Sequence, residues 1–146
     1  MSDSGVIEAA VHRIRIRVYY EDTAAAGIVY HAAYLAFAER ARTEMLRCLG
    51  LDHATLRARF GLVFTVRRCS IDYRAPARLD DLLEVATRVV RLGGASLELE
   101  QRMLRAAQLL AVLEARLALL GADLRVARMP GELISAFDRL RAFNCA

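Results

Sequence analysis

The chain has 146 residues, of which 56% are hydrophobic, and a formal net charge of +4 at pH 7. This length suits one domain with a proper core and is too short for two, so we expect residues 1–146 to form a single globular domain. All 21 basic residues are arginines, and they are spread along the chain between acidic residues. Because no localised basic stripe results, nucleic-acid binding is excluded, and only a modest preference for anionic small molecules remains.

The sequence predicts neither membrane insertion nor a disulfide or metal framework. No run approaches the roughly 20 apolar residues of a membrane span, and the N-terminal residues lack the basic and apolar regions of a signal peptide. The expected location is therefore the cytoplasm. The three cysteines, Cys48, Cys69 and Cys145, are widely spaced and odd in number, so we interpret them as incidental or buried thiols.

A strand, a loop and a long helix are predicted near the N-terminus. Residues 12–20 alternate polar and apolar side chains, as a half-buried strand does. Residues 30–49 place apolar side chains at helical spacing and precede Gly50, a usual helix end. The connecting sequence EDTAAAG contains Gly27, which permits a turn. A helix entered through such a loop offers unpaired N–H groups and a positive dipole end, which can stabilise a developing oxyanion.

Further strands and short helices are predicted downstream. Residues 53–60 have room for one or two helical turns, and residues 62–74 have the β-branched and aromatic composition of a strand. The sequence Ala75-Pro76-Ala77 interrupts that strand. Residues 82–92 predict another strand, which ends at the turn signal Gly93-Gly94.

The last third of the chain contains one ambiguous segment. Residues 95–120 are rich in Ala, Leu, Glu and Arg, and propensity slightly favours a long helix there. The same segment also fits a period of two, which predicts a pair of strands turning near residues 105–108. Pro130 and Gly131 then precede an amphipathic segment, residues 132–143, with helical spacing.

One long motif resembles a known family. The sequence of residues 17–47 is RVYYEDTAAAGIVYHAAYLAFAERARTEMLR. It strongly resembles the signature of the 4-hydroxybenzoyl-CoA thioesterase-like, hotdog-fold acyl-CoA thioesterases, and it is most similar to the branch associated with the Tol–Pal cell-envelope system. Later fragments agree, namely Asp72-Tyr73, residues 75–81, Ser96 and Gln101-Arg102.

The resemblance implies an α+β hotdog fold, in which an antiparallel sheet of about five or six strands wraps one long central helix. It therefore favours two strands over a helix for residues 95–120. It also implies a homodimer or homotetramer with active sites at subunit interfaces. The implied activity is hydrolysis of an acyl-CoA thioester to a free acid and CoA, with no metal or redox cofactor.

The resemblance also identifies the candidate site residues. The family pattern is Asp-Thr-Asp, two small residues, Gly, two aliphatic residues, Tyr and His, and its second Asp is the catalytic carboxylate. Here the triplet is Asp22-Thr23-Ala24, so the catalytic position is occupied by Ala24, which can act neither as base nor as nucleophile. By matching position, the backbone N–H of His31 is the oxyanion donor, its imidazole is a candidate to assist water, and Gly27 shapes the loop.

Asp22 and Glu39 are the nearby carboxylates that could substitute, and neither is favoured. Asp22 is expected to hydrogen-bond loop amides, and Glu39 to pair with Arg42 or with an interface group. Arg40 and Arg42 are expected to be solvated or ion-paired, with a CoA phosphate as the alternative partner. Ala24 is consistent with an engineered replacement and with a natural member that is slow or silent. The alternative function is a non-catalytic module that binds acyl-CoA or an acyl carrier protein.

Overall fold

Six antiparallel strands form a single sheet in the part of the chain that the structure, a computed structural model, describes, residues 3–141. Their order across the sheet is β1-β2-β4-β5-β6-β3, so β3 forms one edge. The strands are β1 (Val6–Glu8), β2 (Val11–Arg17), β3 (Val63–Tyr73), β4 (Leu82–Leu92), β5 (Ser96–Arg105) and β6 (Gln108–Leu120).

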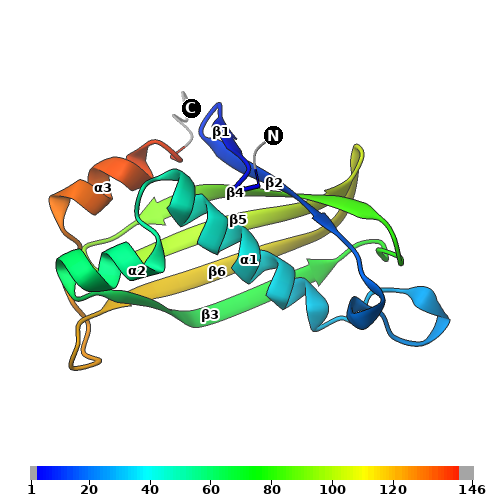
Figure 1. The fold of residues 1–146 in the computed structure, drawn as a ribbon, viewed down its shortest axis with the longest axis horizontal. Helices are drawn as coiled ribbons and strands as arrows, with labels where there is room; N and C mark the ends of the chain where they lie inside the picture. Colours follow the sequence, from blue (N-terminus) through cyan, green and yellow to red (C-terminus); the bar gives the residue numbers. More distant parts are fainter. Residues whose placement is uncertain (1–2, 142–146) are drawn as a thin grey trace.

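A single long helix, α1 (Ala33–Cys48), lies along one face of this sheet (Figure 1). Its buried stripe includes Phe37, Ala38 and Ala41, each with no exposed surface, and Met45. Their helical spacing directs one face of α1 into the core formed with the sheet. The other helical elements of the described residues are short: α2 (His53–Thr55), which continues as a π-helical turn over Leu56–Phe60, and α3 (Gly131–Asp138), with two 3₁₀ turns, Tyr20–Asp22 and Ala25–Gly27, in the loop before α1.

The helical alternative for residues 95–120 is wrong, because the segment forms β5 and β6. The two strands are joined by a tight turn, in which Ala106 has a φ of +53°. Inward-facing Leu97, Leu99 and Met103 are almost completely buried, as an alternating strand requires. Packing against α1 and pairing with neighbouring strands therefore override helix propensity, and the strand pair that the resemblance favoured is confirmed.

Several predicted boundaries shift by a few residues. The first long strand ends at Arg17 instead of residue 20, and α1 begins at Ala33 instead of residue 30. Between the strand and the helix, backbone groups such as the N–H of Val18 and the N–H of Tyr30 hydrogen-bond to loop carbonyls. They therefore extend neither the strand ladder nor the helix. Strand β1 was not predicted, since three residues are too few to show a period. Helix α3 ends at Asp138, so the predicted helix is wrong for residues 139–141, which form a turn and an isolated bridge. Residues 142–143 of that prediction, like Cys145, lie outside the described residues.

Among residues 3–141, no helix combines the length and the apolar character that crossing a membrane requires.

A buried histidine ties the β1–β2 hairpin to the end of α1. His12 has no exposed surface, and its Nε2–H donates to the carbonyl oxygen of Ser4 at 2.8 Å. The Ser4 hydroxyl in turn donates to Glu44 Oε1 at 2.9 Å, and the Cys48 thiol donates to the Ser4 carbonyl at 3.2 Å. The Nδ1 atom of His12 is buried and lacks a hydrogen-bond partner within the described residues. Burial lowers the pKa of His12 below its ordinary 6.5, although the Ser4 carbonyl and Glu44 oppose the shift.

Acid is therefore expected to destabilise this hairpin. Because the folded-state pKa of His12 is lowered, the unfolded chain binds the proton more readily, and stability is lost as the pH falls below about 6.5. His12→Gln keeps a donor but does not titrate, so its free energy of unfolding should fall less between pH 7.5 and pH 5. Urea unfolding of both proteins at the two pH values measures this difference, and equal losses would contradict the assignment.

Candidate active site

The loop between β2 and α1 is closed by its own backbone hydrogen bonds. The N–H of Ala24 donates to the carbonyl of Ile28 at 2.9 Å, and Thr23 and Val29 form an antiparallel bridge. Gly27, with a φ of +73°, makes the turn, as the sequence predicted. Ala24 itself is exposed, and its backbone is extended, with φ −108° and ψ −163°. The loop thus holds Ala24 in a defined and accessible position.

A second segment, residues 77–79, fastens this loop to the body of the protein. The N–H of Val29 donates to the carbonyl of Ala77 at 2.8 Å, and the N–H of Leu79 donates to the carbonyl of Gly27 at 3.0 Å. The Tyr34 hydroxyl, on the first turn of α1, accepts the N–H of Ala77 at 3.0 Å. The loop and the start of α1 are therefore braced by the same segment.

Asp22 is a structural residue of the loop, and its expected hydrogen bonding to loop amides is confirmed. Its side chain is buried, and Oδ2 accepts the backbone N–H of Tyr19 at 2.8 Å. Its carbonyl accepts the N–H of Tyr30 at 2.9 Å. These bonds hold Tyr30 in the loop and help to explain why α1 begins later than predicted. Asp22 is therefore committed to shaping the loop.

His31 lies at the entry to α1, beside a hollow of about 280 Å³ lined also by Val29, Tyr34, Tyr73 and Pro76. The Tyr73 hydroxyl donates to the His31 carbonyl at 2.7 Å. Partial burial raises the pKa of Tyr73 above its ordinary value, so this hydroxyl keeps its proton. Within residues 3–141, the backbone N–H of His31 has no hydrogen-bond acceptor. It is therefore available to a ligand near the positive end of the α1 dipole.

Arg42 does not form the ion pair with Glu39 that the sequence suggested. Its Nη1 donates to Gln101 Oε1 at 2.9 Å, whereas the Gln101 amide nitrogen donates to the Ala38 carbonyl at 3.0 Å and to Thr87 Oγ1 at 3.1 Å. Gln101 and Thr87 have no exposed surface. Burial lowers the pKa of Arg42, with Glu39 opposing the shift by its charge. A buried polar network thus fixes this arginine.

This network was not predicted, although the sequence contains a signal for it. Thr87 and Gln101 occupy inward positions of β4 and β5, where neighbouring inward residues such as Val85 and Met103 are apolar. A polar side chain in the inward phase of a strand indicates a buried hydrogen-bond network.

Replacing Gln101 with leucine is expected to destabilise the fold by about 1–3 kcal/mol, because the Ala38 carbonyl, Thr87 and Arg42 would lose partners in the interior. Gln108→Leu is the matched control, since Gln108 is exposed at the start of β6 and its loss should cost less than about 0.5 kcal/mol. Urea unfolding measures both values. Equal costs would show that the network contributes nothing specific.

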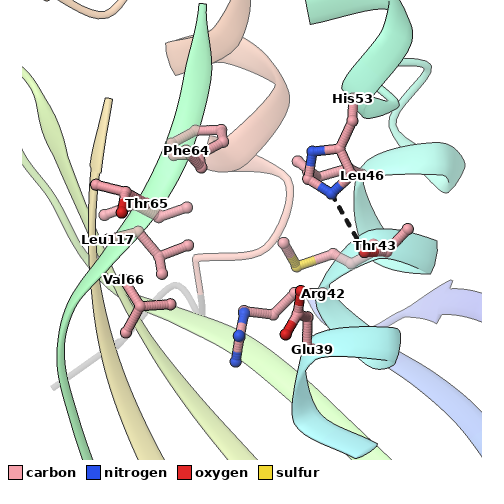
Figure 2. Close-up of a pocket in the computed structure, with 11 residues that line it drawn as sticks. Glu39, Arg42, Thr43, Leu46, His53, Phe64, Thr65, Val66 and Leu117 are labelled. Carbon is pink, nitrogen blue, oxygen red and sulfur yellow. Dashed lines mark hydrogen bonds between the residues drawn. The ribbon is translucent and has the colours of Figure 1, made fainter. Parts of the chain in front are cut away.

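Arg42 also faces a second hollow between α1 and β3, about 220 Å³ in volume. The hollow beside His31 contains Tyr73, at the opposite end of β3 from Phe64, so the two hollows lie at different parts of this strand. Figure 2 shows the second hollow with Glu39, Arg42 and Thr43 projecting from α1, His53 above them, and Phe64, Thr65 and Val66 on the strand.

Comparisons with known proteins identify the fold and the family. The pattern of the Thioesterase superfamily matches residues 26–112. A probable thioesterase from Bartonella henselae superposes with a TM-score of 0.79 at 37% identity, covering 82% of this chain and 99% of that one. A hypothetical protein from Thermus thermophilus gives a TM-score of 0.83 at 33% identity, covering 88% and 98%. The fold is therefore a hotdog fold, as the resemblance implied.

Relatives in sequence support the same assignment. "Acyl-CoA thioesterase YbgC" of Haemophilus influenzae is 43% identical over 127 residues, which cover 86% of this chain and 93% of the relative. "Acyl-CoA thioester hydrolase YbgC" of Escherichia coli is 48% identical over 100 residues, covering 68% of this chain and 74% of the relative. The chain belongs to the thioesterase superfamily.

Proposed function

We propose that this chain binds acyl-CoA thioesters in the manner of an acyl-CoA thioesterase and that Ala24 strongly reduces its turnover. The observation that carries the proposal is the braced loop, which leaves the His31 N–H without an acceptor in the described chain and has alanine at the position of the family carboxylate. The names of the relatives from Haemophilus and Escherichia supply the substrate class and the reaction.

The chain retains the groups proposed to polarise the thioester carbonyl and lacks the carboxylate proposed to attack it. The His31 N–H would donate to the thioester carbonyl oxygen, which becomes an oxyanion when the carbonyl is attacked, and one such donor contributes about a hundred- to a thousand-fold in rate. Gly27 keeps the loop in the shape that presents this donor. Ala24 supplies no carboxylate to attack the carbonyl or to take a proton from water. The His31 imidazole is the remaining group that can assist water.

The assembly is proposed to be a homodimer or homotetramer. Strand β3 is an edge strand of 11 residues, and Val66 and Tyr73 on it are 46% and 45% exposed. Such an edge is a ready site for pairing with another strand. We also assign the chain to the Tol–Pal-associated branch of the 4-hydroxybenzoyl-CoA thioesterase-like group, on the motif at residues 17–47.

The second candidate function is a non-catalytic module that binds acyl-CoA or an acyl carrier protein, and the observation that favours it is Ala24 itself. One experiment separates the two functions. Thiol release from short, long and aromatic acyl-CoAs is measured for the chain and for Ala24→Asp, alongside direct binding of CoA. A rise in turnover for the variant supports the thioesterase. Binding without turnover in either protein supports the module, and neither activity would contradict both.

A further inference from the structure

The hollow between α1 and β3 combines a fixed cation with an apolar wall. A volume of 220 Å³ corresponds to about seven water molecules of about 30 Å³ each. A methylene group is similar in size to a water molecule, so the hollow has room for about seven or eight non-hydrogen atoms, which corresponds to a carboxylic acid of about five or six carbon atoms. Its apolar wall consists of Met45, Leu46, Phe64, Val66, Leu97 and Leu117.

Arg42 supplies the charge that this hollow offers to a ligand. A guanidinium carries five N–H donors in a planar fork, and the hydrogen bond to Gln101 uses only one of the two terminal nitrogens. Within residues 3–141, no carboxylate forms an ion pair with Arg42. Its half-buried charge is thus held in place by an uncharged partner. A ligand carboxylate can accept from the remaining donors in the bidentate geometry that arginine favours.

Glu39 also lines the hollow and opposes an anion. Its side chain is exposed, so water and salt screen its charge more than they screen the half-buried Arg42. The other polar residues there are Thr43, His53 and Thr65, and Thr43 and His53 hydrogen-bond to each other at 3.2 Å. The charges of the hollow together therefore favour binding of an anionic group to Arg42, and the negative charge of Glu39 lowers the affinity.

We propose that this hollow binds a small amphipathic carboxylic acid, with the carboxylate on Arg42 and the hydrocarbon tail against Leu46, Phe64 and Leu117. Arg42 is nine residues beyond Ala33, the first residue of α1, which is about 14 Å along the helix axis, so the bound carboxylate lies away from the proposed thioester site. The proposal rests on the proposed function in one respect: a free acid is the product of thioester hydrolysis, and the site then senses product.

The test measures binding of hexanoate, 1-hexanol and hexylamine to the chain by titration calorimetry. These probes share one tail length and differ in their head groups. Hexanoate is expected to bind in the millimolar range, and the alcohol and the amine at least about tenfold more weakly. Arg42→Met should weaken the binding of hexanoate by a similar factor. Glu39→Gln should strengthen hexanoate binding, because it removes the opposing charge. Arg40→Met is the matched control, because Arg40 is exposed on α1 and does not line this hollow.

Equal affinities for the acid and the alcohol, no binding of hexanoate, or an unchanged affinity in Arg42→Met would overturn the proposal. Because Arg42 is part of a buried network, Glu39→Gln serves as the second variant: it alters only an exposed side chain, and unchanged or weaker hexanoate binding there also contradicts the proposal. No step requires turnover. Failure of this site is therefore distinguishable from failure of the thioesterase assignment, which is decided by CoA binding and by thiol release from Ala24→Asp.

Discussion

Ala24→Asp is expected to raise acyl-CoA hydrolysis by about a hundred- to ten-thousand-fold over the unmodified chain, the range that a positioned acid–base group contributes. The backbone at Ala24 is extended, with φ −108° and ψ −163°, which aspartate adopts without strain. The side chain is exposed, so a carboxylate there remains hydrated and ionised at neutral pH. The loop hydrogen bonds of Ala24 involve only its backbone and survive the substitution.

The matched control for this prediction is Ala24→Asn, which has nearly the same size and shape as aspartate but no ionisable oxygen. It should remain at the rate of the unmodified chain, because an amide can neither attack the thioester nor take a proton from water. The measurement is thiol release across acyl-CoAs of different length. If both variants are equally fast, or if neither exceeds the unmodified chain, position 24 is not where the family carboxylate acts.

Much of the fold followed from local patterns, and its largest ambiguity concerned β5 and β6. Their Ala, Leu, Glu and Arg content suits a helix, and only the burial of alternate residues such as Leu97 and Leu99 shows which period the fold uses. The motif at residues 17–47 resolved that ambiguity through resemblance. Strand β1 is too short to show any period, and its residues form a strand because they pair with β2.

The candidate site was only partly predictable, because its contacts join distant parts of the chain. The turn at Gly27 and the role of Asp22 are local, and both follow from residue type. The partner of Arg42, by contrast, is Gln101, 59 residues away, whereas the sequence offered the nearby Glu39. Likewise, the bond from Tyr73 to the His31 carbonyl spans 42 residues. Only the sheet order, which places β3 at one edge and β5 across from α1, brings these groups together.

Phe37→Ala is expected to destabilise the protein by about 3–5 kcal/mol, the cost of removing a large buried aromatic side chain and leaving a cavity. Phe37 has no exposed surface and meets the Tyr34 ring edge to face, with centroids 6.1 Å apart. Because it lies on the buried face of α1, its loss weakens the contact that holds the central helix against the sheet. Tyr20→Ala is the matched control, since Tyr20 is 81% exposed. This substitution should change the free energy of unfolding by no more than about 0.5 kcal/mol.

Urea unfolding of the three proteins measures the two costs, with an unchanged m-value showing that the same surface is exposed on unfolding. The aromatic contact also links stability to the site, because Tyr34 accepts the Ala77 N–H that braces the loop. A cavity beside Tyr34 should therefore lower the activity gained by Ala24→Asp more than Tyr20→Ala does. If Phe37→Ala lowers the free energy of unfolding no more than Tyr20→Ala does, α1 is not the element around which this sheet packs. The proposed support of the loop by α1 would then also be wrong.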